Sequence, residues 1–233
     1  ARERNGPMEL IPASSAYNKT YFLKRFARYA GKPAQPFLIQ AGKYDRHVGR
    51  RGSVTSIPTD RGKSVWISEK KLVPFAQFLG WYISEGSLSF GDGTGPRIAL
   101  YQKKETSYKI RRVLNDLEWK HAVALYKRNG VHQIYFGNSA LANWLKQWGV
   151  GSYDKRIPPF CFEWPINLRR ELLEALLAGD GGVNGSGSWV YSTCNEKLAD
   201  DVQLLISLDR GPANIRETRA SITQTKMFRV LKT

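Results

Sequence analysis

The pattern of apolar and polar positions predicts a series of helices and strands that occurs twice along the chain. Residues 72–83 are almost wholly apolar and predict a buried helix, and residues 168–178 predict a second one. After the first helix, the pattern predicts strands and helices at 97–101, 104–117, 121–127, 131–136 and 138–148. After the second helix, it predicts elements at 189–193, 195–208, 213–217 and 221–230. An offset of about one hundred residues indicates an internal repeat.

The first 70 residues precede this repeat and follow a different pattern. Residues 17–29 predict a short basic helix, residues 37–39 a strand, and residues 43–63 a loop or a long hairpin. This part of the chain holds 14 Lys and Arg against 5 Asp and Glu, so it is its more strongly cationic third. Near the middle of residues 43–63, contact with DNA phosphates and a merely solvated loop are both open interpretations for Arg46, Arg50 and Arg51.

The overall charge narrows the class of partner. The chain carries 36 Lys and Arg against 20 Asp and Glu, a net charge of +16, which favours nucleic acid. A basic soluble protein, a ribosomal location or an acidic membrane surface are the alternatives. The sequence has no apolar run of membrane-spanning length and no apolar signal segment at its start. We therefore expect an intracellular protein, cytoplasmic or nucleoid-associated, that does not enter a membrane.

The two apolar helices carry matching residues at their ends. Small residues correspond at two positions, Gly80 with Ala175 and Ser84 with Gly179, and each helix finishes in an acid followed by glycine. Small side chains let two helix axes approach more closely than about 8–10 Å. We therefore expect the acids at the two helix ends, Glu85 and Asp180, to lie side by side.

Paired carboxylates at this place suggest a chemistry. Adjacent carboxylates repel each other, and they are tolerated when they share a divalent cation. Mg²⁺, or Mn²⁺, suits such oxygen ligands and supports displacement at a phosphodiester. The alternative is that Glu85 and Asp180 are ordinary helix-terminal acids, although a negative charge at a helix C-terminus opposes the helix dipole.

Both helix ends resemble the LAGLIDADG, or dodecapeptide, motif of homing endonucleases. Residues 78–86 are similar to the intein-type form, in which Gly-Trp-Tyr precedes an acid-Gly pair. Lys155-Arg156-Ile157-Pro158 resembles the junction between the two halves of such enzymes, and residues 101–104 resemble a strand-to-helix turn that keeps a polar residue in the site. The resemblance covers about residues 70–230 of the sequence.

The resemblance implies an α+β fold of two pseudo-symmetric αββαββα repeats, with antiparallel sheets that form a saddle over DNA. The expected divisions are a basic N-terminal extension with DNA contacts at 1–70, a first repeat at 71–156 and a second at 157–233. The implied activity is metal-dependent cleavage of double-stranded DNA at a long, low-symmetry site by a monomer.

The resemblance also assigns roles to residues. Glu85 and Asp180 match the metal-binding acids, with Ser84 and Gly179 beside them at the metal. Gln102 matches a residue that contacts metal-bound water, and Lys155 a basic residue near the scissile phosphate; a solvated linker lysine is the alternative. Base contacts are expected from polar strand residues, namely Arg97, Tyr101, Lys103, Lys127, His132, Ser192, Arg216, Arg219, Thr223 and Gln224.

Departures from the family pattern leave other functions open. Thr193 stands where the second repeat would match Gln102, and no second counterpart of Lys155 is visible before Thr233, so either the natural chain continues or the second site is reduced. A cleavage-deficient DNA-binding regulator or an RNA maturase on the same scaffold is the alternative to an endonuclease. Ala1 and Thr233 lack the groups needed for protein splicing, so we do not expect the chain as given to splice.

Overall fold

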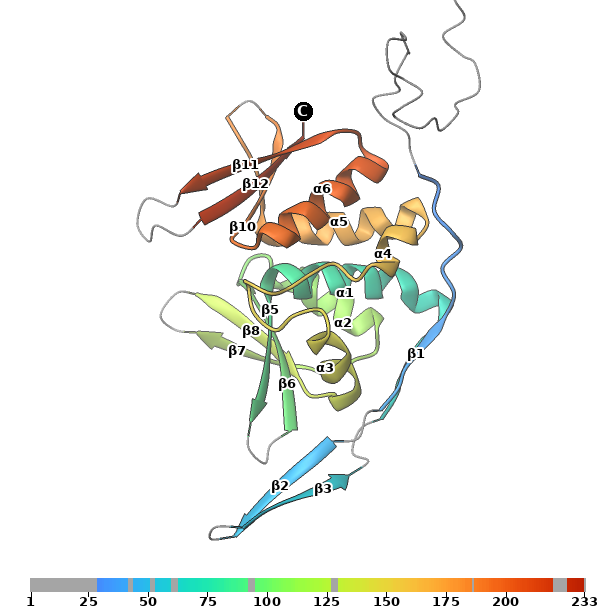
Figure 1. The fold of residues 1–233 in the computed structure, drawn as a ribbon, viewed down its shortest axis with the longest axis vertical. Coiled ribbons are helices and arrows are strands. Elements are labelled where there is room, and N and C mark those ends of the chain that lie inside the picture. The colour runs from blue at the N-terminus through green and yellow to red at the C-terminus, as the bar shows by residue number, and fades with distance from the viewer. Residues whose placement is uncertain are drawn as a thin grey trace, which may run out of the picture.

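A computed structural model describes the chain in eight stretches, residues 29–41, 44–50, 53–59, 63–91, 95–126, 130–185, 187–219 and 226–232. Within them, the central part of the chain folds into two similar halves (Figure 1). The first half consists of α1 (Leu72–Glu85), β5 (Gly86–Gly91), β6 (Gly95–Lys103), α2 (Ser107–Asp116), β7 (Ala122–Tyr126), β8 (Val131–Phe136) and α3 (Ser139–Lys146). The second half consists of α5 (Ile166–Asp180), β9 (Gly181–Val183), β10 (Trp189–Thr193), α6 (Glu196–Asp209), β11 (Ala213–Arg219) and β12 (Lys226–Lys232).

The two halves have the same sheet topology. Each contains a four-stranded antiparallel sheet, in the order β5-β6-β8-β7 in the first half and β9-β10-β12-β11 in the second. Even the register agrees, because Gly86 pairs with Leu100 and Gly181 with Tyr191 directly after the two long helices. The predicted α+β fold of two repeats with antiparallel sheets is therefore confirmed. The first half has the full predicted αββαββα order, and the described residues of the second half have the order αββαββ.

The helices lie against one face of each sheet, with α1 and α5 side by side at the centre of the molecule (Figure 1). Successive residues of a strand point to opposite faces of its sheet. In β6, Ile98 and Leu100 are buried toward the helices, whereas Arg97 and Lys103 are exposed on the other face. Each sheet therefore has one face in the core and one open face.

The short elements depart from the sequence prediction. The second helix of the first half begins at Ser107 rather than at residue 104, because residues 104–106 form a turn. Two strands that the pattern did not resolve, β5 and β9, follow directly on the acid of each long helix. A single-turn helix, α4 (Phe160–Glu163), lies between the halves.

Part of the N-terminal region belongs to the core rather than to a separate extension. β1 (Phe37–Ile39) pairs with β4 (Val65–Ile67), and the side chains of Ile39, Val65 and Ile67 are buried in the same cluster as α1. A 3-10 turn, η2 (Glu69–Lys71), then leads into α1. Only part of residues 1–70 can therefore lie outside the compact body.

Residues 29–41, which we call the N-terminal strap, run along the edge of the molecule from the second half to the first (Figure 1). At its start, the amide of Tyr29 donates to the carbonyl of Leu208 in α6 (3.1 Å). Further on, Lys32 forms an ion pair with Glu163 of α4 (2.8 Å). Near its end, the ring of Phe37 packs edge-on against Phe75 of α1. The strap therefore contacts both halves.

Residues 44–59 confirm the hairpin alternative for the basic segment. β2 (Tyr44–Arg50) pairs with β3 (Ser53–Thr59) as an antiparallel ladder, and the pair extends beyond the first sheet (Figure 1). The predicted helix at 17–29 lies outside the described residues, apart from Tyr29. No helix in the described part of the chain is long and apolar enough to cross a membrane.

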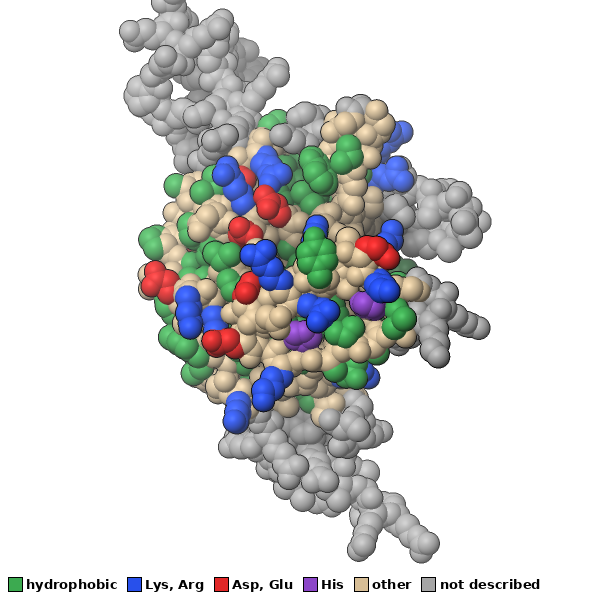
Figure 2. Space-filling view, turned by 180° about the vertical axis from the view of Figure 1, so that it is seen from behind, with side chains coloured by type: hydrophobic (Ala, Val, Ile, Leu, Met, Phe, Trp, Pro, Cys, Tyr) green, Lys and Arg blue, Asp and Glu red, His purple; other side chains and the backbone are tan. Residues whose placement is uncertain are grey.

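The face of the molecule opposite to the view of Figure 1 carries charges of both signs. Lys and Arg side chains are spread over it and interspersed with fewer Asp and Glu side chains (Figure 2). This face is therefore not a single cationic patch.

Candidate active site

The close contact between α1 and α5 is made by the small residues that the sequence singled out. A Cβ on Gly80 would lie 2.6 Å from the Cβ of Ala175, and a Cβ on Gly179 would overlap the Cβ of Ser84. Real Cβ atoms do not approach other atoms so closely, so only glycine fits at these two positions. The predicted small-residue contact is confirmed, and it brings the C-terminal ends of the two helices together.

Glu85 and Asp180 are the last residues of these helices and lie at the same end of the pair. Burial raises the pKa of Glu85 to about 7, the charge of Asp180 adds to the shift, and Lys155 and Gln102 oppose it. Burial also raises the pKa of Asp180 to about 6, against the influence of Lys155 and the Tyr191 hydroxyl. Both carboxyls are thus held where the charged form is costly, as expected of a site that gains from a bound cation.

Lys155 is buried near the Glu85 and Asp180 carboxyls and does not extend into solvent. Its side chain is only 2% exposed, and its ammonium donates to the carbonyls of Tyr82 (2.9 Å), Ile83 (3.0 Å) and Gly86 (2.6 Å). An ammonium has three N–H donors, so all of them are used at the C-terminus of α1. Burial lowers the pKa of Lys155 to about 8, while Asp180 and Glu85 oppose the shift.

These contacts exclude the solvated-lysine alternative, and they also differ from the expected role of Lys155. In this structure, Lys155 has no N–H free for a phosphate. It is instead a buried cation that binds the end of α1 and lies near both carboxylates. Lys155 therefore contributes to the site in two ways: its positive charge acts on both carboxylates, and its hydrogen bonds hold the end of α1 in place.

Gln102 contacts the acid of the first half directly. Its amide nitrogen donates to Glu85 Oε1 (3.2 Å), and its own Oε1 accepts from the amide of Lys103 (2.8 Å), which fixes the side chain. In the second half, the strand register places Thr193 at the equivalent position, as predicted. The Thr193 hydroxyl accepts from the amide of Asn195 (3.1 Å). The two acids therefore have different neighbours.

The connection between the halves is held by buried polar contacts. Arg156 forms a two-pronged ion pair with Asp201 of α6 (2.6 and 2.7 Å), and the amide of Ile157 donates to the same carboxylate (3.0 Å). Asn195 donates to the carbonyl of Lys155 (2.7 Å). The connection is thus fixed to the second half while the Lys155 side chain binds the first, which holds the two helix ends in place.

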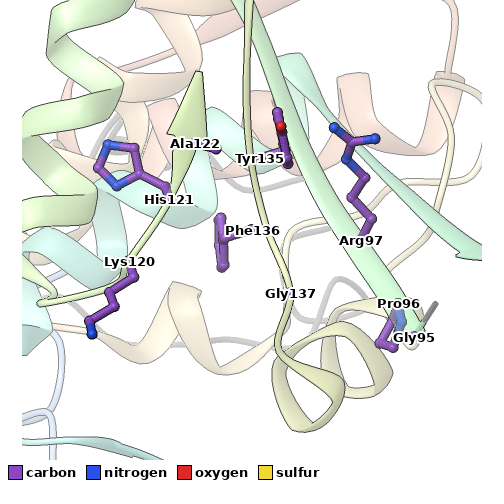
Figure 3. Close-up of a pocket in the computed structure, with 9 residues that line it drawn as sticks. All are labelled: Gly95, Pro96, Arg97, Lys120, His121, Ala122, Tyr135, Phe136 and Gly137. Atoms are coloured by element: carbon purple, nitrogen blue, oxygen red, sulfur yellow. The ribbon is translucent and has the colours of Figure 1, made fainter. Parts of the chain in front are cut away.

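The open face of the first sheet carries several predicted DNA-contacting residues. Arg97 and Lys103 are exposed there, and Tyr101 lies between them on the same face. The guanidinium of Arg97 stacks 3.6 Å over the ring of Tyr135. Figure 3 shows this pair on neighbouring strands, at a pocket that Lys120 and His121 also line. Gln133 donates to the Tyr101 hydroxyl (2.7 Å).

His132 does not share this face. Its ladder partners are Gln102 and Leu125, whereas Tyr101 pairs with Gln133. Its Nδ1 lies 2.8 Å from the Ser107 hydroxyl at the start of α2. The alternation of the strand thus turns His132 toward the helices, away from the face that carries Arg97 and Lys103, and its expected base contact stays a prediction.

The open face of the second sheet contains an arginine that sequence reasoning missed. Ser192 pairs with Arg229, and Arg229 with Arg216, so the three residues form one row across β10, β12 and β11. Ser192 and Arg216 are predicted DNA contacts, and Arg229 is the residue that was missed. Arg229 is exposed between the buried Phe228 and Val230. The alternation of apolar and basic residues at 228–230 is the sequence signal that could have revealed it.

The remaining predicted DNA contacts rest on side chains that the structure does not describe. Arg46 and Arg50 lie in β2, and Arg219 ends β11, each with only its backbone described. The others lie outside the described residues, namely Arg51, Lys127, Thr223 and Gln224.

The groups at the two helix ends fit a hard divalent cation. Among the described residues, no three Asp, Glu, His or Cys side chains gather at a metal-binding distance, so Glu85 and Asp180 would be the protein's charged ligands. The hydroxyl of Ser84 donates to the carbonyl of Leu176 (3.2 Å), and Gly179 has no side chain. These two residues could therefore add only main-chain oxygens, which Mg²⁺ and Mn²⁺ accept beside water and phosphate.

Sequence comparison finds similar segments inside much longer proteins of Methanocaldococcus jannaschii. The uncharacterised protein MJ1054 is 28% identical over 202 residues, covering 78% of this chain and 22% of that protein. RNA polymerase subunit Rpo1C is 28% identical over 155 residues, covering 64% and 17%, and the replication factor C small subunit 30% over 149 residues, covering 55% and 8%. The chain thus spans about a fifth or less of each relative. No family model matches it.

Structure comparison identifies the fold. The homing endonuclease I-DmoI, in a complex with DNA and calcium, superposes with a TM-score of 0.51 at 11% identity, covering 71% of this chain and 85% of that one. Mesophilic variants of the same enzyme give 0.50 at 11% identity, covering 70% and 90%. The chain therefore has the fold of this class of DNA-binding endonuclease.

Proposed function

We propose that this protein is a site-specific endonuclease of the LAGLIDADG homing type, which hydrolyses both strands of DNA at a long, low-symmetry site with Mg²⁺ or Mn²⁺. The observation that carries the proposal is the pair of half-buried carboxyls, Glu85 and Asp180, at the ends of two helices in glycine-mediated contact. Ordinary helix-terminal acids point into solvent, where they lose no hydration. These two are half-buried and lie near each other, at the point where both sheets begin.

The rest of the site supports the same chemistry. Gln102 orients Glu85, and Lys155 places a positive charge beneath both acids while it fixes the end of α1. A divalent cation bound by the acids would neutralise charge on the attacking and leaving oxygens of a phosphodiester displacement. Residues of the open strand faces, such as Arg97, Arg216 and Arg229, would hold the duplex across the two halves.

The comparisons add a reason to propose a mobile element. Similar segments occur within proteins whose names describe transcription and replication, and they take up only a small share of each. A module that is not tied to the activity of the surrounding protein suits carriage by an intein or an intron. Cleavage of an unoccupied gene copy is the activity that such a carrier would need.

The test is cleavage of a randomised duplex library by the purified chain in Mg²⁺, Mn²⁺ or EDTA. We expect one long motif to be cut with either metal, and no cutting in EDTA. Glu85→Gln and Asp180→Asn should each slow cleavage by about 100-fold or more while binding persists, because each removes a metal ligand but keeps the shape.

The matched control is Glu174→Gln, which makes the same charge change on α5 at an exposed position paired with Arg210. It should cleave like the wild type. Sequence-specific binding without cleavage by the wild type would contradict the proposal and favour the cleavage-deficient regulator, whereas selective binding of folded RNA would favour the maturase.

A further inference from the structure

The environment of Asp180 contains a buried group that the proposed mechanism does not use. Tyr191 in β10 is completely buried, and its hydroxyl has no hydrogen-bond partner of ordinary geometry among the described residues. Asp180 and Ser84 both lie close enough to interact with it. Buried polar groups are nearly always paired, so an unpaired phenol beside a proposed metal ligand needs an explanation.

The repeat supplies a comparison within the same molecule. Gly181 pairs with Tyr191, and Gly86 pairs with Leu100, so Tyr191 and Leu100 occupy equivalent positions under the two acids. Leu100 is as deeply buried as Tyr191. A leucine satisfies the packing of this position without any polar atom, so packing alone does not require the hydroxyl in the second half.

The two halves also differ two residues further along the same strands. In the first half, Gln102 reaches Glu85 with its amide. At the equivalent place in the second half, the hydroxyl of Thr193 is bound to the backbone of Asn195. Asp180 thus has no amide donor like that of Glu85 at this position, whereas the phenol of Tyr191 is close enough to interact with it.

We propose that Tyr191 is a positioning residue, which donates its hydroxyl hydrogen to the Asp180 carboxylate and so orients that group. Each half would then orient its acid with a different donor, an amide for Glu85 and a phenol for Asp180. This inference rests on the proposed endonuclease. Its consequence is that the two DNA strands are cut at unequal rates, with a nicked intermediate.

The experiment uses the full chain and the duplex recovered from the library, with a different fluorophore on each strand. The rate constant for cutting each strand is measured at saturating protein and Mg²⁺. Removing a group that orients a metal ligand costs about 10- to 100-fold in affinity or activity. Tyr191→Phe is therefore expected to slow one strand by that factor and to change the ratio of the two rate constants, with folding stability unchanged or higher.

The control is Tyr82→Phe, which removes another buried phenol, one that donates to the carbonyl of Gly149 (2.6 Å). It should lower stability and leave the strand ratio unchanged, because the hydroxyl that it removes donates to a backbone carbonyl and not to either acid. Tyr191→Leu introduces the residue type of Leu100, the equivalent position in the first half, and removes the phenol by a second substitution.

An unchanged ratio in both Tyr191 variants, with the wild type cutting normally, would overturn this inference and leave the endonuclease intact. Equal slowing of both strands would do the same, since it would indicate a structural role. Absence of cutting by the wild type would instead overturn the proposed function and this inference together.

Discussion

At the scale of single residues, folding makes the charged forms of the Glu85 and Asp180 carboxyls less favourable than they are in the unfolded chain. Each is partly withdrawn from water, and each lies near the other. Their ordinary pKa values are 4.5 and 3.8, and in the folded protein the values rise to about 7 and 6. Between about pH 4 and pH 7, the folded chain therefore holds protons that the unfolded chain releases. The free energy of unfolding must then fall as pH rises through this window.

Glu85→Gln should remove much of this penalty. At pH 8 without metal, we expect the variant to be more stable than the wild type by about 1–2 kcal/mol, a figure reduced to allow for the partial exposure of Glu85. At pH 5 the difference should shrink, because the native glutamate is then protonated. Urea unfolding in EDTA at both pH values measures it. A variant equally or less stable than the wild type at pH 8 would contradict the assignment of a destabilising charge pair.

Residue types could be predicted from sequence more readily than residue partners. The acid-Gly ends marked both carboxyls, and alternation within strands marked Arg97 and Arg216. The partners of Lys155 could not be predicted, since its ammonium binds carbonyls about 70 residues earlier in the chain. The orientation of His132 was missed because the bounds of β8 were predicted correctly but not which of its alternate residues face the helices.

At the scale of elements, the crossing of α1 and α5 determines the site. Gly179 contacts Ser84 at the crossing, one residue before each acid. The helices themselves were predictable because α1 is almost wholly apolar and the apolar residues of α5 recur at helical spacing. β5, β9 and α4 were not, because glycine and serine in the strands and the single turn of the helix give no periodic signal.

Gly179→Ala tests the helix contact. The new Cβ would overlap the Cβ of Ser84, so we expect a loss of about 1–3 kcal/mol in the free energy of unfolding together with reduced cleavage. Chemical denaturation measures the first effect. Ser84→Gly in the same chain removes the clashing atom and should restore part of the loss.

The matched control for this pair is Gly182→Ala, on the strand that follows, where an added Cβ meets nothing within 4 Å. It should leave the helix contact unaffected. If the double variant were no more stable than Gly179→Ala alone, the overlap with Ser84 would not be the cause of the loss.

At the scale of the whole molecule, the two sheets present open faces of different character. The first carries Arg97 stacked on Tyr135, and the second a row with Arg216 and Arg229. The identical strand order could be predicted from the repeat. The row could not, because it requires the register of three strands that are far apart in sequence.

Arg216→Ala and Arg229→Ala should weaken DNA binding, and each should lower the slope of log affinity against log salt by about one if its guanidinium contacts a phosphate. Fluorescence anisotropy over a salt series measures both. Arg112→Ala is the control, since Arg112 lies on α2, at a groove between helices. Equal slopes for all three variants and the wild type would place the duplex elsewhere.

The N-terminal strap limits how the halves of such proteins can be recombined, because it contacts both of them. A chain of two repeats can be divided at the connection between them to make a hybrid. Here the N-terminal strap, which completes the first half, begins against the second half. The amide of Tyr29 donates to the carbonyl of Leu208 in α6, and the guanidinium of Arg169 in α5 donates to the carbonyl of Tyr29. A cut near residue 156 would leave residues 29–36 without their binding surface. A hybrid made from two such proteins should therefore take its strap contacts, as well as its helix crossing, from one parent.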